Sequence, residues 1–83
     1  MKELMVGVQN VVGNGGEVFR ISYYRLEDNH SYGICVRNQL GEAAIFVDVT
    51  RDRRRINALL RAMMRGGVTP MAAQDVVTDW LIR

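Results

Sequence analysis

The chain has 83 residues and a mass of 9.4 kDa, the size of one small domain. Hydrophobic residues make up 48% and charged residues 24%, a composition typical of a folded globular protein and not of a disordered chain. The longest apolar runs fall far short of the roughly 18 residues that a membrane-spanning helix needs. The net charge of +2 is too small to indicate nucleic-acid binding on its own.

The charges and the cysteine are unevenly placed. Residues 1–50 hold four basic and six acidic side chains (net −2), whereas residues 51–83 hold seven and three (net +4). Cys35 is the only cysteine, which excludes an intramolecular disulfide and favours a reducing compartment. The first residues lack the apolar core of a signal peptide. We therefore expect a cytoplasmic protein.

The first fifty residues show period-two patterning between turn signals, which predicts three or four antiparallel strands. In the second segment, for example, Phe19, Ile21 and Tyr23 share one face. The expected strands lie within residues 4–12, 17–26, 32–37 and 43–49, and the turn signals lie at 13–16, 27–30 and 38–42.

The period changes at residue 50. Thr50 is the expected N-cap of a first helix, and Asp52 places a negative charge in its first turn, where the helix dipole favours it. Four apolar residues follow at helical spacing, and Gly66-Gly67 is expected to end the helix. These four residues are Ile56, Leu59, Leu60 and Met63.

A second helix has the clearest start signal in the chain. Thr69 is its expected N-cap and Pro70 its first residue. Its expected apolar stripe contains Ala73, Val76, Val77, Trp80 and Leu81. The sequence therefore predicts one α+β domain over residues 1–83: an antiparallel β-meander of three or four strands, followed by a C-terminal helical hairpin packed on one sheet face.

The C-terminal run also carries a resemblance. Val68-Thr69-Pro70 through Asp75-Val76-Val77-Thr78-Asp79-Trp80-Leu81 resembles the C-terminal signature of a family of short uncharacterised proteins from Firmicutes. Tyr32-Gly33-Ile34 and Asp48-Val49-Thr50 are similar to that family's central strand and its strand-to-helix junction. The resemblance covers about residues 17–82. It implies one compact bacterial domain and no particular activity.

The residues that carry chemistry are few. If residues 31–36 are extended, the backbones of His30 and Cys35 lie about 16 Å apart, too far for a nucleophile–base pair. Asp75 and Asp79 share a helix face, but two carboxylates fall short of a calcium site. Gly13-Asn14-Gly15-Gly16 lacks the sequence context of a phosphate-binding loop. We therefore expect no enzyme activity, no cofactor, no metal and no small-molecule substrate.

One candidate binding surface is basic. Arg54, Arg61 and Arg65 are expected to share the side of the first helix opposite its apolar residues. The arginines either stay solvated, pair with Asp75 and Asp79 across the helical hairpin, or bind nucleic acid or an acidic protein. No aromatic residue lies among them to stack on single-stranded bases. Accessory nucleic-acid binding is therefore the alternative function.

The other candidate is the sheet face that the helices leave open. Its expected partner-binding residues are Tyr24, Phe46, Arg20 and Arg37, because aromatic residues and arginine are typical of interfaces. In this prediction, the residues expected to face the helices are Leu4, Val6, Phe19, Ile21, Tyr23, Ile34, Val36, Ile45 and Val47. The residues expected on the open side also include Met5, Val18, Cys35 and Ala44. Either the face binds a second copy or another protein, or it is covered within the chain, or its apolar residues are simply exposed. The leading hypothesis is a non-catalytic protein-interaction module, possibly homodimeric, with no membrane contact.

Overall fold

Four antiparallel strands pair in chain order and two helices follow them, in a computed structural model that describes residues 1–82. The elements are β1 (Lys2–Val12), β2 (Val18–Glu27), β3 (Tyr32–Asn38), β4 (Ala43–Thr50), α1 (Arg53–Gly66) and α2 (Pro70–Leu81). The predicted α+β class, the meander and the C-terminal helix pair are confirmed, and the strand number is four.

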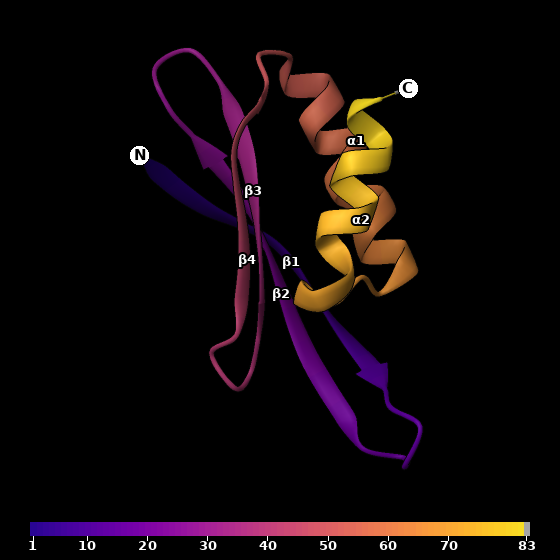
Figure 1. The fold of residues 1–83 in the computed structure, drawn as a ribbon. Coiled ribbons are helices and arrows are strands. Elements are labelled where there is room, and N and C mark those ends of the chain that lie inside the picture. Colours follow the sequence, from indigo (N-terminus) through magenta and orange to yellow (C-terminus); the bar gives the residue numbers. More distant parts are fainter. Residues whose placement is uncertain (83) are drawn as a thin grey trace.

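Both helices lie on the same side of the sheet (Figure 1). The core between the two layers is small, and ten buried residues form it: Ile21, Tyr23, Ile34 and Val36 from the sheet, Ile56, Leu59, Leu60 and Met63 from α1, and Ala73 and Val77 from α2. The molecule measures 41 by 26 by 17 Å. The end of the β1–β2 hairpin extends beyond the helices (Figure 1), so part of this hairpin has no helix above it.

Helix α1 begins two residues later than the sequence indicates. β4 continues to Thr50, and the N-cap is Asp52, whose carboxylate accepts hydrogen bonds from the backbone N–H groups of Arg54 and Arg55. The prediction of Thr50 as N-cap was wrong, because its hydroxyl instead accepts from the N–H of Asp52. The predicted glycine end is confirmed: Gly67 is the C-cap, with the left-handed φ of 60° that favours glycine.

Helix α2 begins as predicted. The Thr69 side chain accepts a hydrogen bond from the N–H of Ala72, and Pro70 occupies the first turn. Trp80 is half-buried against the core, whereas Leu81 is exposed. The prediction that Leu81 belongs to the apolar stripe was wrong. Each residue of an α-helix is rotated by about 100° from the one before it, so the side chain of Leu81 points away from the sheet when that of Trp80 points toward it.

The faces of β4 are the reverse of the predicted ones. Phe46 pairs with Ile34 and packs against the core, as does Ala44, whereas Ile45 and Val47 are 60% and 56% exposed. All five residues 43–47 are apolar, so alternation does not tell which set faces the helices. Pairing with β3 decides it, because cross-strand partners share a face.

The first strand departs from strict alternation at a bulge. The register of β1 against β2 shifts between Met5 and Gly7. Val6, predicted to face the helices, is therefore exposed, and Gly7 lies under α1 instead, where a Cβ atom would meet the sulfur of Met64. The bulge thus changes which residues of β1 contribute to the core.

A second irregularity lies at the end of β4. Ile34 pairs with Phe46 but Tyr32 pairs with Thr50, so β4 has two more residues than β3 over this stretch. Asp48 lies within it and has a left-handed φ of 55°, an unusual conformation for a residue with a side chain. A bulge of this kind bends its strand locally.

Candidate functional site

The sheet face opposite the helices, called here the open face, is strongly apolar. Large apolar side chains are exposed on it along the two edge strands and at the hairpin end, with polar residues such as Asn10 and Ser22 among them. These apolar side chains are Met5, Val8, Val12, Val18, Ile45 and Val47. In the central strands, Leu26 and Cys35 also lie on this face and are buried by their neighbours. An exposed patch of this kind is typical of a contact surface.

The centre of the open face carries one arginine whose charge is balanced within the chain. The Arg37 guanidinium lies 5.2 Å from the centroid of the Tyr24 ring. One of its nitrogens, Nη1, lies 3.5 Å from Oε1 of Glu3, and the other, Nη2, donates to Sγ of Cys35 at 3.8 Å. Burial raises the pKa of the Cys35 thiol, and the positive charge of Arg37 partly opposes that rise.

Three of the four predicted partner-binding residues lie on the open face. Tyr24 and Arg37 are in contact, and Arg20 is exposed, with its backbone N–H bonded to Oε1 of Gln39 at 2.8 Å. The prediction that Phe46 lies on the open face was wrong, because its side chain packs against the core on the helix side. The residues that sequence reasoning missed here are Ile45 and Val47, and their pairing register with β3 is the signal that identifies them.

The second predicted surface, Arg54, Arg61 and Arg65, is called here the arginine surface. All three side chains are exposed, on the side of α1 opposite its buried residues. Within residues 1–82, ion pairs join only Arg25 to Glu27 and Arg37 to Glu3, so the predicted pairing of Arg61 or Arg65 with Asp75 is not formed. The arginine surface thus has no carboxylate partner in the described part of the chain.

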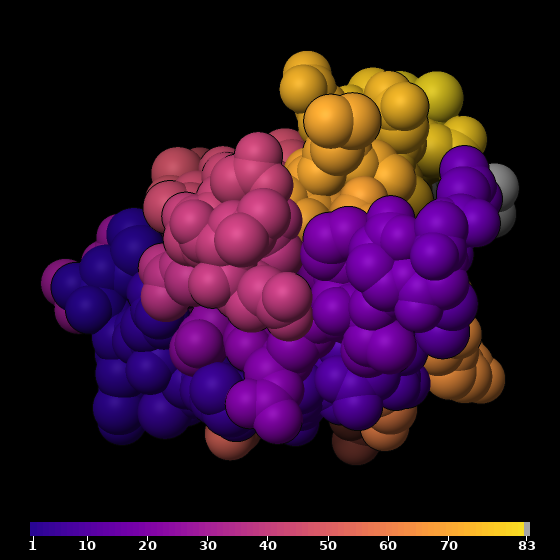
Figure 2. All heavy atoms as spheres, turned by 90° about the horizontal axis from the view of Figure 1, so that it is seen from below, coloured from indigo at the N-terminus to yellow at the C-terminus, as the bar shows by residue number. Residues whose placement is uncertain are grey.

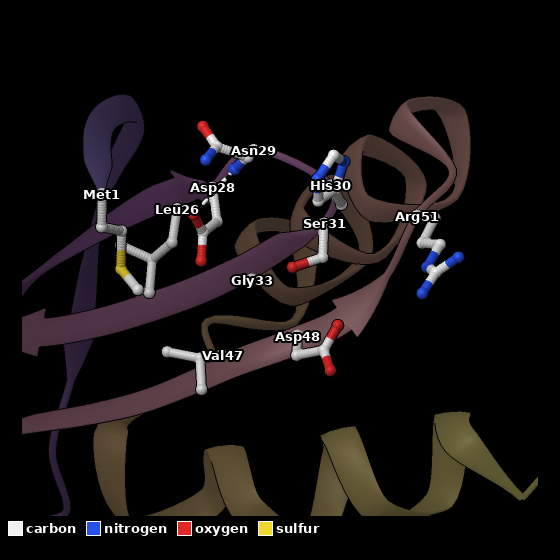
Figure 3. Close-up of a pocket in the computed structure, with 10 residues that line it drawn as sticks. All are labelled: Met1, Leu26, Asp28, Asn29, His30, Ser31, Gly33, Val47, Asp48 and Arg51. Carbon is white, nitrogen blue, oxygen red and sulfur yellow. Dashed lines mark hydrogen bonds between the residues drawn. The ribbon is translucent and has the colours of Figure 1, made fainter.

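Among the hollows in the surface of residues 1–82, two are relevant here. One, called here the end pocket, has a volume of about 390 Å³ and lies at the bulged end of β4 (Figure 3). The other, of about 420 Å³, lies where the β1–β2 hairpin, the β3–β4 turn and the start of α2 meet (Figure 2). Its walls are mostly apolar: Phe19, Ile21, Asn38, Glu42, Ala43, Thr69, Pro70 and Met71.

Two further features bear on the chemistry. Across the described residues, no three His, Cys, Asp or Glu side chains are grouped so as to hold a metal ion. Neither α1 nor α2 has the length and apolar character that crossing a membrane requires.

Comparison with known proteins identifies a family but no activity. Residues 2–83 match the model of a protein family described as a family of unknown function. No curated protein and no solved structure matches the chain. The function is therefore to be sought in the surfaces of the molecule itself.

Proposed function

The chain belongs to the DUF6514 family of unknown function. Because the family indicates no activity, we propose a function from the surface of the molecule: a non-catalytic, cytoplasmic protein-interaction module whose partner is a second copy of itself. The observation that carries the proposal is the open face. Helices cover one side of the sheet, while the other side exposes six large apolar side chains. Removing apolar surface from water stabilises by about 25 cal/mol per Å², so covering this face is favourable.

The size of the face suits a dimer of this kind. Four strands about 4.8 Å apart, each about nine residues long, span roughly 19 by 30 Å, or about 600 Å² in projection. Each partner in a stable interface gives about 800 Å² of accessible surface, which is the same scale because side chains roughen the face. Two twisted sheets also pack well face to face, about 10 Å apart. A second copy supplies such a sheet.

The charges of the face suit an identical partner better than an oppositely charged one. Glu3 balances Arg37 within the chain, and Tyr24 carries the guanidinium against its ring. Burying the centre of the face therefore leaves no unpaired charge there, which is the costly case. The other basic side chain of this face, Arg20, lies toward the hairpin end of the paired β1–β2 strands, where an interface stays wet.

Sedimentation equilibrium over a range of concentrations tests the proposal. We expect the wild type to dimerise and Ile45→Asp to be monomeric, because the substitution buries a carboxylate at the interface. Met71→Asp is the matched control: Met71 is 91% exposed but lies on the helix side, so this variant should dimerise like wild type. A wild type that stays monomeric at all concentrations contradicts the proposal, as does equal weakening by the two variants.

A second candidate, accessory nucleic-acid binding, rests on the arginine surface. Arg54, Arg61 and Arg65 are seven and four residues apart, which places them about 10 and 6 Å apart along the helix axis. Guanidinium groups at such spacing suit successive backbone phosphates. Asp52, the nearest carboxylate in sequence, is engaged in capping α1. The arginines are therefore free of intramolecular ion pairs among residues 1–82.

Fluorescence anisotropy with labelled duplex DNA and RNA at several salt concentrations tests this candidate. Three phosphate contacts predict a slope of about −3 in a plot of log K against log salt. Replacing Arg54, Arg61 and Arg65 by Ala should abolish binding, whereas the Lys2→Ala/Arg20→Ala control should retain it. Absence of binding at low salt, or equal loss in both variants, contradicts this function.

A further inference from the structure

The end pocket is lined by both apolar and charged side chains. Leu26 is buried in its wall, and Val47 and Met1 add apolar surface. In Figure 3, Met1, Leu26 and Asp28 lie toward one end, and His30 and Arg51 toward the other, with Asp48 below them. The full lining is Met1, Leu26, Asp28, Asn29, His30, Ser31, Gly33, Val47, Asp48 and Arg51. Its volume of about 390 Å³ lies within the range of about 300–1,000 Å³ for small-molecule sites.

The backbone around the pocket is unusual on both strands. Asp48 keeps a φ of 55°, which costs energy for a residue with a side chain. Opposite it, Gly33 is buried, and a Cβ atom there would collide with the backbone carbonyl of Phe46. The close approach of β4 thus requires glycine on one strand, and the bulge holds a strained aspartate on the other. Bulges and strained residues of this kind are enriched at binding sites.

Three of the four titratable side chains that line the pocket are not used within the described part of the fold. The side chains of Asp48, Arg51 and His30 form no hydrogen bond or ion pair with any residue of the described chain. Asp28 differs, because its Oδ1 accepts a hydrogen bond from the N–H of Asn29 at 2.7 Å and so shapes the turn. Two carboxylates, of Asp28 and Asp48, and the guanidinium of Arg51 therefore line the same hollow, and no ion pair joins them in the described chain.

We infer that the end pocket binds a free α-amino acid with an apolar side chain. Its ammonium group pairs with Asp48, its carboxylate with Arg51, and its side chain lies against Leu26 and Val47. Guanidinium and carboxylate form the strongest common charge-assisted hydrogen bonds. This inference goes beyond the proposed self-association. Leu26 and Val47 also belong to the open face, so a monomeric variant is needed to test it separately.

Ligands of a single charge fit the same pocket less well. A phosphate or a dicarboxylate would meet Asp48 and Asp28 as well as Arg51, and a metal ion would meet Arg51. Either arrangement brings like charges together in a partly apolar hollow, which is unfavourable. A zwitterion satisfies both signs at once.

NMR titration of the full chain with leucine, observed in amide spectra, tests the inference. We expect shifts confined to residues around the end pocket and a dissociation constant in the millimolar range, as suits so few contacts. N-acetylleucine lacks the ammonium group and leucinamide lacks the carboxylate, so each should bind at least about tenfold more weakly, in line with one lost charged hydrogen bond. Equal binding of all three, or no shifts with leucine, overturns the inference.

Variants locate the two contacts. Asp48→Asn keeps a residue that tolerates positive φ, so it should fold and lose at least about tenfold in leucine affinity; Arg51→Gln should do the same. Arg53→Gln is the control, because Arg53 is exposed but does not line the pocket. Unchanged affinity in Asp48→Asn overturns the inference. Repeating the titration with Ile45→Asp separates leucine binding from self-association. This variant is expected to be monomeric, so leucine binding to it does not depend on whether the wild type dimerises.

Discussion

The hydroxyl of Tyr23, in the middle of β2, donates a hydrogen bond of 2.7 Å to the backbone carbonyl of Val68, in the turn between the two helices. The Tyr23 side chain is fully buried, and Val68 in turn donates its N–H to the carbonyl of Met63. The sheet is thereby fixed to the helical hairpin at the point where the chain reverses. Arg25 makes a comparable link near the other end of the core, where its Nη1 donates to Oδ1 of Asn57 at 2.9 Å.

Tyr23→Phe should lower the free energy of unfolding by about 1–2 kcal/mol, because the carbonyl of Val68 would lose a buried partner. Urea denaturation measures the effect. Tyr32→Phe is the control, since the Tyr32 hydroxyl forms no hydrogen bond with the described residues, and it should change stability by less than about 0.5 kcal/mol. Equal losses in the two variants would mean that the hydrogen bond contributes nothing specific.

Alkaline pH should weaken the fold through the same residue. Burial raises the pKa of Tyr23 from 10.0 to about 12. The folded state therefore holds this proton more tightly than the unfolded state, and stability from it is complete below pH 10 and lost as the pH rises toward 12. Thermal unfolding between these pH values should show a steeper decline in wild type than in Tyr23→Phe. Parallel declines would assign the alkaline sensitivity to other groups.

Gly33→Ala should destabilise the protein by more than about 1 kcal/mol, because the added Cβ meets the backbone carbonyl of Phe46 and backbone moves less readily than a side chain. Gly66→Ala provides the contrast. At Gly66, in the last turn of α1, the nearest atom to an added Cβ is the Cγ2 of Val68 at 3.6 Å, an ordinary contact. Alanine there should stabilise by about 0.5–1 kcal/mol. We expect the denaturant midpoint of Gly33→Ala to lie below that of the wild type and the midpoint of Gly66→Ala to lie above it. Two midpoints that are both higher or both lower would contradict these opposite roles of the two glycines.

Cys35 should react slowly with thiol reagents in the folded protein. It is fully buried, and burial raises the pKa of its thiol, which disfavours the nucleophilic thiolate. We expect alkylation at neutral pH to accelerate strongly when urea unfolds the chain. A native rate equal to the unfolded rate would show that the open face does not protect this residue.

The sequence identifies the helices well because their signals are local. Thr69 and Pro70 mark the start of α2 by the chemistry of capping alone, and Gly67 ends α1 for the same reason. The buried residues of α1 were predicted completely, since a strongly polar helix has one apolar stripe to bury.

The sheet was harder to predict in detail because its irregularities depend on distant residues. Two bulges, at Val6 and around Asp48, shift which side chains share a face, and neither has a signature in the chain around it. The reversed faces of Ile45 and Phe46 follow from pairing with β3. The end pocket was missed for a similar reason: residues 28–31 and Asp48 meet only once the strands are aligned.

The order of strands in the sheet, β1-β2-β3-β4, has a kinetic consequence. Each strand pairs with its immediate neighbour along the chain through a short turn, so the loops that must close during folding are short. Isolated β-hairpins of this kind form in about 1–10 μs. The valines of the first two strands are therefore exposed only briefly as single unpaired segments, which limits their opportunity to aggregate before the sheet is complete.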